Sequence, residues 1–300
     1  MIHQLKRFTM KKYYLLFIVL FLSIYQSNAQ LLWKISGNGL EKPSYIFGTH
    51  HLAPLSILDS IPVFNDAFNS CSTVYGELIM DKDQMQTEAM KFAGLMMSPP
   101  DSTLDVVLSK DQFEKLNQIT TENMGVTADQ VKILKPAALS TQLALMAHIK
   151  HFKDFKPEEQ LDQLMQTRAK AANKNVGSLE TMEQQMNILF GASLKEQAKS
   201  LVILMDHFDQ LDYVVQIMND AYMAQDLEKL LSLMTDEKYG ANKEELERIL
   251  YARNKNWDGQ LKEILPKNEP IFIVVGAGHL PGEDGIIELL RKQGYTVEPA

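Results

Sequence analysis

Short apolar segments of strand length lie towards both ends of the chain, and segments of helical period fill its middle. Runs of four to eight residues that are rich in β-branched and aromatic side chains predict strands. These runs lie at residues 31–36, 44–47, 73–78, 176–179, 271–275 and 295–298. The Gly37-Asn38-Gly39 sequence between the first two runs predicts a tight hairpin turn.

Between residues 81 and about 265 apolar side chains recur every three or four positions, which is the period of an amphipathic helix. One segment, Asn175 to Glu180, interrupts this region and predicts a strand that returns to the sheet. Two further helices are expected at residues 57–70 and 282–293. The fold class is therefore α/β: a mixed central sheet with flanking helices and a large helical insertion, about 81–265, between its N- and C-terminal halves. Residues 30–300 are expected to form a single domain.

The first 29 residues have the pattern of a secretory signal peptide. Four basic residues precede an apolar run at 13–25, and Ser27-Asn28-Ala29 supplies a cleavage site. We expect a mature protein that begins at Gln30, is exported to the periplasm or secreted, and has no stable membrane span after cleavage. An uncleaved signal anchor and a true start at Met10 are the alternatives.

Net charge and cysteine content limit the partners and the metal ligands that are expected. Without its four basic leader residues the chain has 26 Lys and Arg against 38 Asp and Glu, a net charge of −12. No dense basic run remains, so nucleic acid is not an expected partner. Cys71 is the only cysteine, so an internal disulfide is impossible and any metal would need His, Asp or Glu ligands.

Four polar residues follow predicted strands, at the edge where open α/β sheets usually bind ligands. His51 and His279 each follow a strand and a glycine turn, and Glu77 and Glu180 end two other strands. Histidine and glutamate are the residue types that hold a catalytic divalent metal or transfer protons. These four residues therefore form the candidate site.

Each of these residues also has a structural interpretation. A strand-end histidine is often only hydrogen-bonded, and Glu180 lies where an acidic residue stabilises the helix expected from Thr181. His148 and His151, next to Lys150 and Lys153, are expected on a solvated helix surface.

The chain lacks the sequence signatures of several other classes of enzyme. Pro281, Glu283 and Asp284 after the glycine turn disfavour a dinucleotide. The chain has neither a Gly-x-Ser-x-Gly elbow nor a His-Glu-x-x-His helix.

Several motifs together resemble the TraB/GumN family, which includes the Tiki proteins. They are Tyr-Ile-Phe-Gly-Thr-His-His, Val-Tyr-Gly-Glu-Leu, Ser-Leu-Glu-Thr-Met-Glu-Gln, Arg253-Asn254 with Trp257, and Val-Val-Gly-Ala-Gly-His-Leu-Pro-Gly-Glu-Asp-Gly. The resemblance implies an α/β fold with paired Gly-x-x-His motifs and, for Tiki-like members, metal-dependent peptidase activity. Arg253 and Asn254 are retained from the family pattern and are expected on a helix. The arginine would pair with Glu77 or Glu180, stabilise an oxyanion, or form only a surface salt bridge.

The sequence thus predicts an exported metal-dependent hydrolase that acts on a peptide or protein substrate. His51, His279 and Glu77 are the expected metal ligands, with Glu77 and Glu180 interchangeable as ligand and general base. Mn²⁺, Co²⁺ and Zn²⁺ all suit nitrogen and oxygen donors. The alternatives are a non-catalytic periplasmic binding protein for a peptide or metal-bearing ligand, and metal-free acid–base hydrolysis by the histidines.

Overall fold

A computed structural model describes residues 30–151, 160–267 and 269–300, so the predicted signal peptide lies outside the described residues. Six strands form one mixed sheet in the order β4-β3-β5-β2-β1-β6, and all six coincide with predicted strands. Their bounds are β1 Leu32–Ser36, β2 Ser44–Thr49, β3 Thr73–Gly76, β4 Asn175–Ser178, β5 Ile271–Gly276 and β6 Thr296–Pro299. The fold class predicted from sequence is confirmed.

Strand direction places four strand ends at one edge. β2, β5, β3 and β4 are mutually parallel, whereas β1 pairs antiparallel with β2 and with β6. Gly37, Asn38 and Gly39 of the β1–β2 turn all have positive φ, which explains the two glycines there. Because β2, β5, β3 and β4 run in the same direction, the residues that follow them gather at a common edge.

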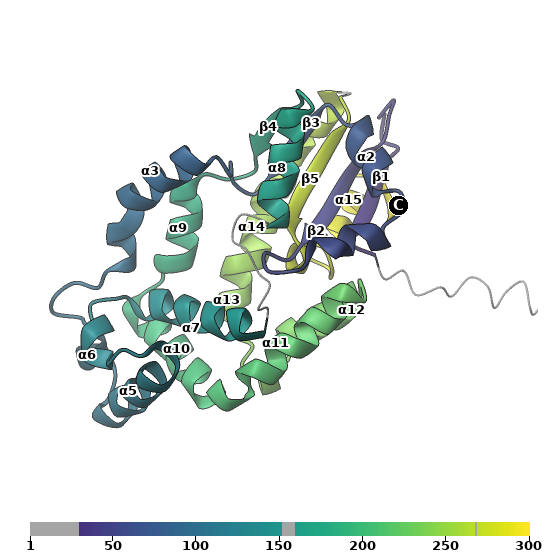
Figure 1. Cartoon of the computed structure of the whole chain (residues 1–300). Helices are drawn as coiled ribbons and strands as arrows, with labels where there is room; N and C mark the ends of the chain where they lie inside the picture. Colours follow the sequence, from purple (N-terminus) through teal and green to yellow (C-terminus); the bar gives the residue numbers. More distant parts are fainter. Residues whose placement is uncertain (1–29, 152–159, 268) are drawn as a thin grey trace, which may run out of the picture.

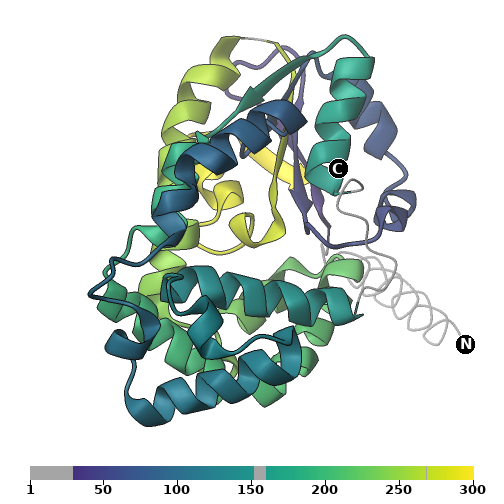
Figure 2. The ribbon, with the colours of Figure 1, turned by 60° about the vertical axis from the view of Figure 1, so that its left-hand side comes forward.

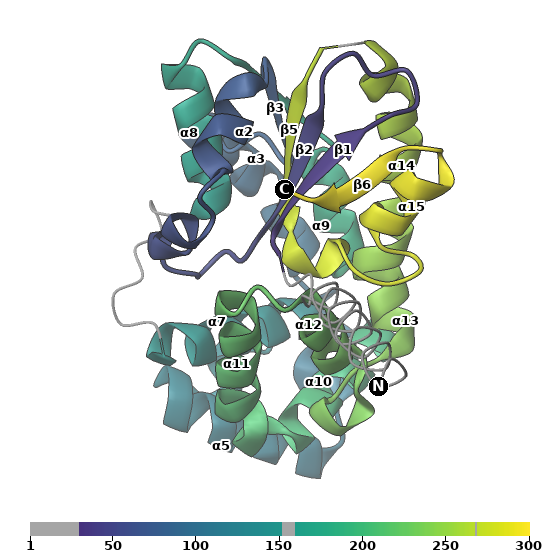
Figure 3. The ribbon, with the colours of Figure 1, turned by 90° about the vertical axis from the view of Figure 1, so that its right-hand side faces the viewer.

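Helices cover both faces of the sheet, which makes this half a three-layer structure (Figure 3). α2 (Phe64–Ser70) and α8 (Leu161–Ala171) lie on one face. α14 (Ala252–Ile264) and α15 (Ile286–Lys292) lie on the other. The rings of Phe47, Phe64 and Phe272 pack edge to face between the sheet and α2, with centroids 4.9 and 5.5 Å apart.

Most of the remaining helices form a second half of the molecule, beyond the carboxyl ends of the parallel strands, whereas α3 (Lys82–Phe92) lies beside the sheet (Figures 1 and 2). This half has its own buried core, to which Leu116, Leu139, Leu143 and Leu201 contribute. The helices after α3 that contribute to this half are α4 Leu104–Val107, α5 Lys110–Met124, α6 Ala128–Val131, α7 Pro136–His151, α9 Met182–Phe190, α10 Leu194–Asp206, α11 Phe208–Met223, α12 Leu227–Thr235 and α13 Lys243–Leu246. A π-helical turn, η6 (Glu247–Tyr251), joins α13 to α14.

Two predicted helices are shorter in the structure. The helix expected at 57–70 is divided into the 3-10 helix η2 (Leu55–Ser60) and α2, because Pro62 keeps the preceding Ile61 out of the helical region, at φ −120° and ψ 84°. The helix expected from residue 282 begins only at Ile286, since Gly282 has a positive φ and Gly285 is extended. Over the described part of the chain, no helix has the length and apolar character needed to span a bilayer.

Candidate active site

The structure brings all four strand-end residues to the same edge of the sheet. Register pairs Thr49 at the end of β2 with Gly276 of β5, and Gly76 of β3 with Ser178 of β4. His51, Glu77, Glu180 and His279 follow those positions within three residues. The helical half of the molecule faces this edge, and α12 packs against the short helix η8 (Ala277–His279) that carries His279.

Arg253 joins the two glutamates in a buried ion-pair network. Its Nε and Nη2 donate to the two oxygens of Glu180, at 3.1 and 2.6 Å, and Nη2 also donates to Glu77 Oε2 at 2.6 Å. The three side chains are 10, 11 and 1% exposed for Arg253, Glu77 and Glu180. Arg253 is therefore not the surface salt bridge considered from sequence, and it neutralises part of a dense negative charge.

His279 is held by the same helix that carries Arg253. Its Nδ1 lies 2.7 Å from Asn254 Oδ1, whose amide nitrogen is engaged by the carbonyls of His279 and Asp284. Since the amide oxygen can only accept, Nδ1 carries the proton and Nε2 presents a lone pair. That Nε2 lies 3.1 Å from Arg253 Nη1 and 3.8 Å from Glu77 Oε1.

His51 has a matching arrangement. Its Nδ1 lies 2.9 Å from Asp162 Oδ2 at the start of α8, and Asp162 Oδ1 accepts a hydrogen bond from Thr49 at 2.8 Å. The His51 ring is 62% exposed, while Asp162 is nearly buried. In each histidine a fixed side-chain oxygen therefore orients the ring through Nδ1 and leaves Nε2 for other partners, the arrangement typical of metal-binding and catalytic histidines.

Burial and neighbouring charges move the pKa values in opposite directions. Burial alone raises the pKa of Glu77, but His279, Arg253 and His51 outweigh it and lower the value to about 2. Burial raises the pKa of Glu180 despite its bonds to Arg253. Burial lowers the pKa of His279 to about 4, and the Asp162 carboxylate raises that of His51 to about 9. The two glutamates thus differ in acidity, as paired catalytic carboxylates commonly do.

The donors suit a divalent cation, although they are not arranged as a finished metal site. Within residues 30–151, 160–267 and 269–300, no group of three or more His, Cys, Asp or Glu side chains could hold a metal ion as it stands. The imidazole nitrogens of His51 and His279 and the Glu77 carboxylate are nevertheless the donor types that Mn²⁺, Co²⁺ and Zn²⁺ accept. The Arg253 guanidinium lies against both Glu77 and His279 Nε2, so it and a cation would compete for the same donors.

His148 lies in a different environment from the solvated helix surface predicted for it. The rings of His50 and His51 have different neighbours, as strand alternation predicts. The His50 ring lies 5.4 Å from Tyr222 and 5.9 Å from His148, and His148 is half-buried. The prediction of a solvated His148 is therefore wrong: the neighbouring lysine suggested exposure, but the ring packs against the turn that carries the site. The side chain of His151 is outside the described part of the structure.

Sequence reasoning missed Asp162 and Gln185, and it named Trp257 only as part of a motif, without a role; all three organise the site. Asp162 orients His51, Gln185 donates to Glu180 at 3.0 Å, and the buried Trp257 ring packs 4.4 Å from His279 and under Arg253. Asp162 has the position of an ordinary first-turn acidic residue, and Gln185 that of an ordinary helix residue, so neither gives a local signal. Trp257 does give a local signal, because it follows Arg253-Asn254 at helical spacing.

Fold and site together define an α/β protein with a buried cluster of glutamate, histidine and arginine at the carboxyl edge of its parallel strands. The sequence profile of the TraB/PrgY/gumN family matches residues 31–299, and the chain belongs to this family.

Curated relatives of the chain are metalloproteases. It is 24% identical over 314 residues to metalloprotease TIKI2 of Danio rerio, and the aligned region covers 89% of this chain and 60% of that protein. It is 24% identical over 316 residues to metalloprotease TIKI1 of Homo sapiens, with 90 and 61% coverage. A metalloprotease TIKI homolog of Nematostella vectensis is 23% identical over 308 residues, with 85 and 64% coverage. The chain thus spans a little over three fifths of these relatives' length, and no solved structure matches it significantly.

Proposed function

We propose that this protein is an exported metal-dependent hydrolase that cleaves peptide bonds. The observation that carries the proposal is the cluster of Glu77, Glu180, Arg253 and His279, which is buried at a strand-end edge in a chain whose relatives are metalloproteases. Burying two carboxylates and a guanidinium is costly, so a fold retains such a cluster most readily where it does chemistry.

His51, His279 and Glu77 would hold the cation. Asp162 and Asn254 orient the two rings, and Glu77 Oε1 lies 3.8 Å from His279 Nε2. His51, whose pKa Asp162 raises to about 9, would release its Nε2 proton on binding the cation. Ionised Glu77, with its pKa near 2, suits a ligand better than a base. When bound, a divalent cation supplies a Lewis acid that polarises the scissile carbonyl.

The other residues act on protons and developing charge. Glu180, whose pKa is raised by burial, is the better proton acceptor for the attacking water and the donor to the leaving amine. Glu180 is also among the residues that line a cavity of about 310 Å³, together with Leu78, Met85 and Phe92. Arg253 would stabilise the oxyanion of the tetrahedral intermediate. Asn254 keeps His279 in the tautomer with an unprotonated Nε2.

Hydrolysis can be tested with a peptide mixture analysed by mass spectrometry. Protein purified with its metal content preserved should cleave peptides, lose activity with a chelator, and recover it with Mn²⁺, Co²⁺ or Zn²⁺. His279→Ala should abolish cleavage, whereas Glu298→Gln, which removes a surface carboxylate paired only with Lys34, should not. Peptides that bind without being cleaved under any metal condition would contradict hydrolysis and favour a binding protein. Cleavage that is indifferent to chelator would instead favour acid–base hydrolysis by the histidines.

A further inference from the structure

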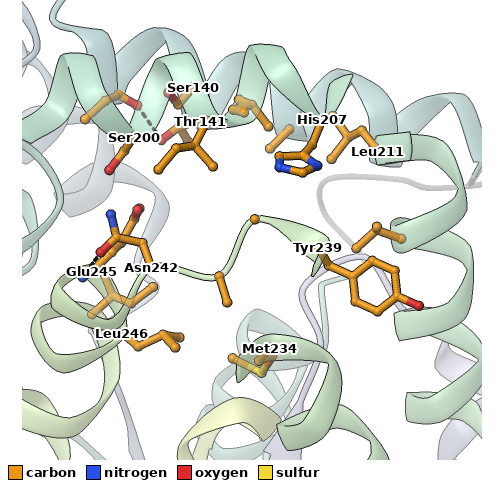
Figure 4. A pocket seen from close by; sticks show the side chains of 18 of the residues that line it. Ser140, Thr141, Ser200, His207, Leu211, Met234, Tyr239, Asn242, Glu245 and Leu246 are labelled. Atoms are coloured by element: carbon orange, nitrogen blue, oxygen red, sulfur yellow. Dashed lines mark hydrogen bonds between the residues drawn. The ribbon is translucent and has the colours of Figure 1, made fainter. Parts of the chain in front are cut away.

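A cavity of about 390 Å³ lies inside the helical half, between α7, α10 and α11 on one side and residues 233–249 on the other (Figure 4). Its volume is within the range of pockets that bind small organic ligands. Most of its walls are apolar, with Ala144, Ile203, Leu211, Val214, Met234 and Leu246 among the lining residues. An apolar group would therefore gain free energy by leaving water for this cavity.

The cavity also offers polar contacts. The His207 ring projects into it, with Asn242 and Tyr239 on the opposite wall (Figure 4). The Nδ1 atom of His207 is buried, and no residue in the described ranges forms a hydrogen bond with it. A buried polar nitrogen without a partner is destabilising, so His207 is poised to bond a polar group of an occupant.

The cavity wall is continuous with the candidate active site. Met234 lines the cavity and touches Gly278, since a Cβ added to that glycine would lie 2.7 Å from Met234 Cε. Gly278 directly precedes His279. Ile249, which also lines the cavity, accepts a hydrogen bond through its carbonyl from Arg253 Nη1 at 3.1 Å. Ile249 belongs to the π-helical turn η6, a distortion that is frequent at functional sites.

We propose that this cavity is the specificity pocket for a large apolar side chain of the peptide substrate. The inference rests on the proposed function, because it places the bound side chain beside a peptide bond at Arg253 and His279. The apolar walls hold the side chain, and His207 and Asn242 bond the adjoining peptide group. Met234 and Ile249 separate the pocket from the site, since each lines the pocket and contacts Gly278 or Arg253.

Binding of short peptides, measured by calorimetry on chelator-treated protein, separates the pocket from the chemistry. The probes are acetylated, amidated pentapeptides of glycine with Ala, Leu or Phe at the centre. Burying the larger side chain predicts binding at least about tenfold tighter for Leu or Phe than for Ala. Ser200→Leu, which fills the cavity from α10, should reduce this preference to less than about threefold, in line with the loss of that burial. Ser232→Leu is the matched control on the exposed surface of α12 and should keep the preference.

Ala241→Leu fills the opposite wall and replaces Ser200→Leu if circular dichroism shows that variant to be unfolded. Equal affinity for the Ala and Phe peptides, no measurable binding of either, or a preference that survives a folded cavity-filling variant would each overturn the pocket. Tight, Ser200-dependent binding of a Phe peptide that is never hydrolysed with added metal would keep the pocket and overturn the hydrolase. Hydrolysis of the peptides without a preference for an apolar side chain would keep the hydrolase and overturn the pocket.

Discussion

Replacing Arg253 with Met tests whether the guanidinium neutralises the two buried glutamates. The substitution keeps an unbranched side chain but removes hydrogen bonds at 2.6, 2.6 and 3.1 Å to carboxylates that are 11 and 1% exposed. Loss of one partner from a buried ion pair costs about 3–5 kcal/mol, because the remaining charge has no compensation. We therefore expect Arg253→Met to lower the free energy of unfolding at pH 7 by about that amount.

Urea unfolding followed by circular dichroism, with chelator present, measures this change. Without the arginine, burial and mutual repulsion raise the pKa values of Glu77 and Glu180, so the variant should approach wild-type stability as the pH falls and protonates them. Glu180→Gln added to Arg253→Met should recover part of the loss, since it removes one of the two repelling charges. Lys115→Met, which removes a cation from an exposed pair with Asp206, should cost less than about 1 kcal/mol. A similarly small loss for Arg253→Met, or a loss that does not shrink at lower pH, would refute the reasoning.

Three further substitutions and one chemical modification have defined outcomes. Gly48→Ala would bring a Cβ to 2.8 Å from Leu280 Cδ1 and 3.0 Å from Ala277 Cα, so thermal unfolding should show a free energy of unfolding lower by about 1–3 kcal/mol. Gly259→Ala, on the exposed face of α14, meets no atom within 4 Å and should raise the free energy of unfolding by about 0.5–1 kcal/mol. Equal effects would contradict the packing. Asp162→Ala frees the His51 ring, so metal titration should show affinity about 10–100-fold weaker, and unchanged affinity would exclude His51 as an oriented ligand. Burial raises the pKa of Cys71 from 9.0 to about 11, so the folded thiol stays protonated between those values. Iodoacetamide at pH 10 should modify it rapidly only in denaturant, and fast labelling of folded protein would show that the thiol is accessible.

The fold could be predicted from the sequence because each strand has a local sequence pattern. Each strand is a short apolar run, and the shared direction of β2, β3, β4 and β5 brought His51, Glu77, Glu180 and His279 to one edge as expected. The contacts that organise those residues are not local. Asp162 meets His51 across 111 positions, and Tyr222 donates to the carbonyl of Gly48 across 174. Nothing in the neighbouring residues encodes such pairings, which depend on how α8 and α11 dock.

The pairing of Arg253 with the glutamates was one of three alternatives from sequence. Helical spacing places Arg253 and Trp257 on one face of α14, but whether that face is solvated depends on the packing of α14 against η8 and the strand ends. The structure buries that face, so the arginine meets Glu77, Glu180 and His279 together. The cavity in the helical half had no sequence signal either, because its apolar lining is indistinguishable from ordinary helix core until the helices are placed.

The most direct test of metal dependence is the binding of Mn²⁺, Co²⁺ or Zn²⁺ to chelator-treated protein, measured by calorimetry and checked by elemental analysis. We expect wild type to bind one ion per chain, His279→Ala and Glu77→Gln both to lose this binding, and Glu298→Gln to keep it. Wild type that binds none of the three ions, or binds one with the same affinity after both site substitutions, would contradict the account.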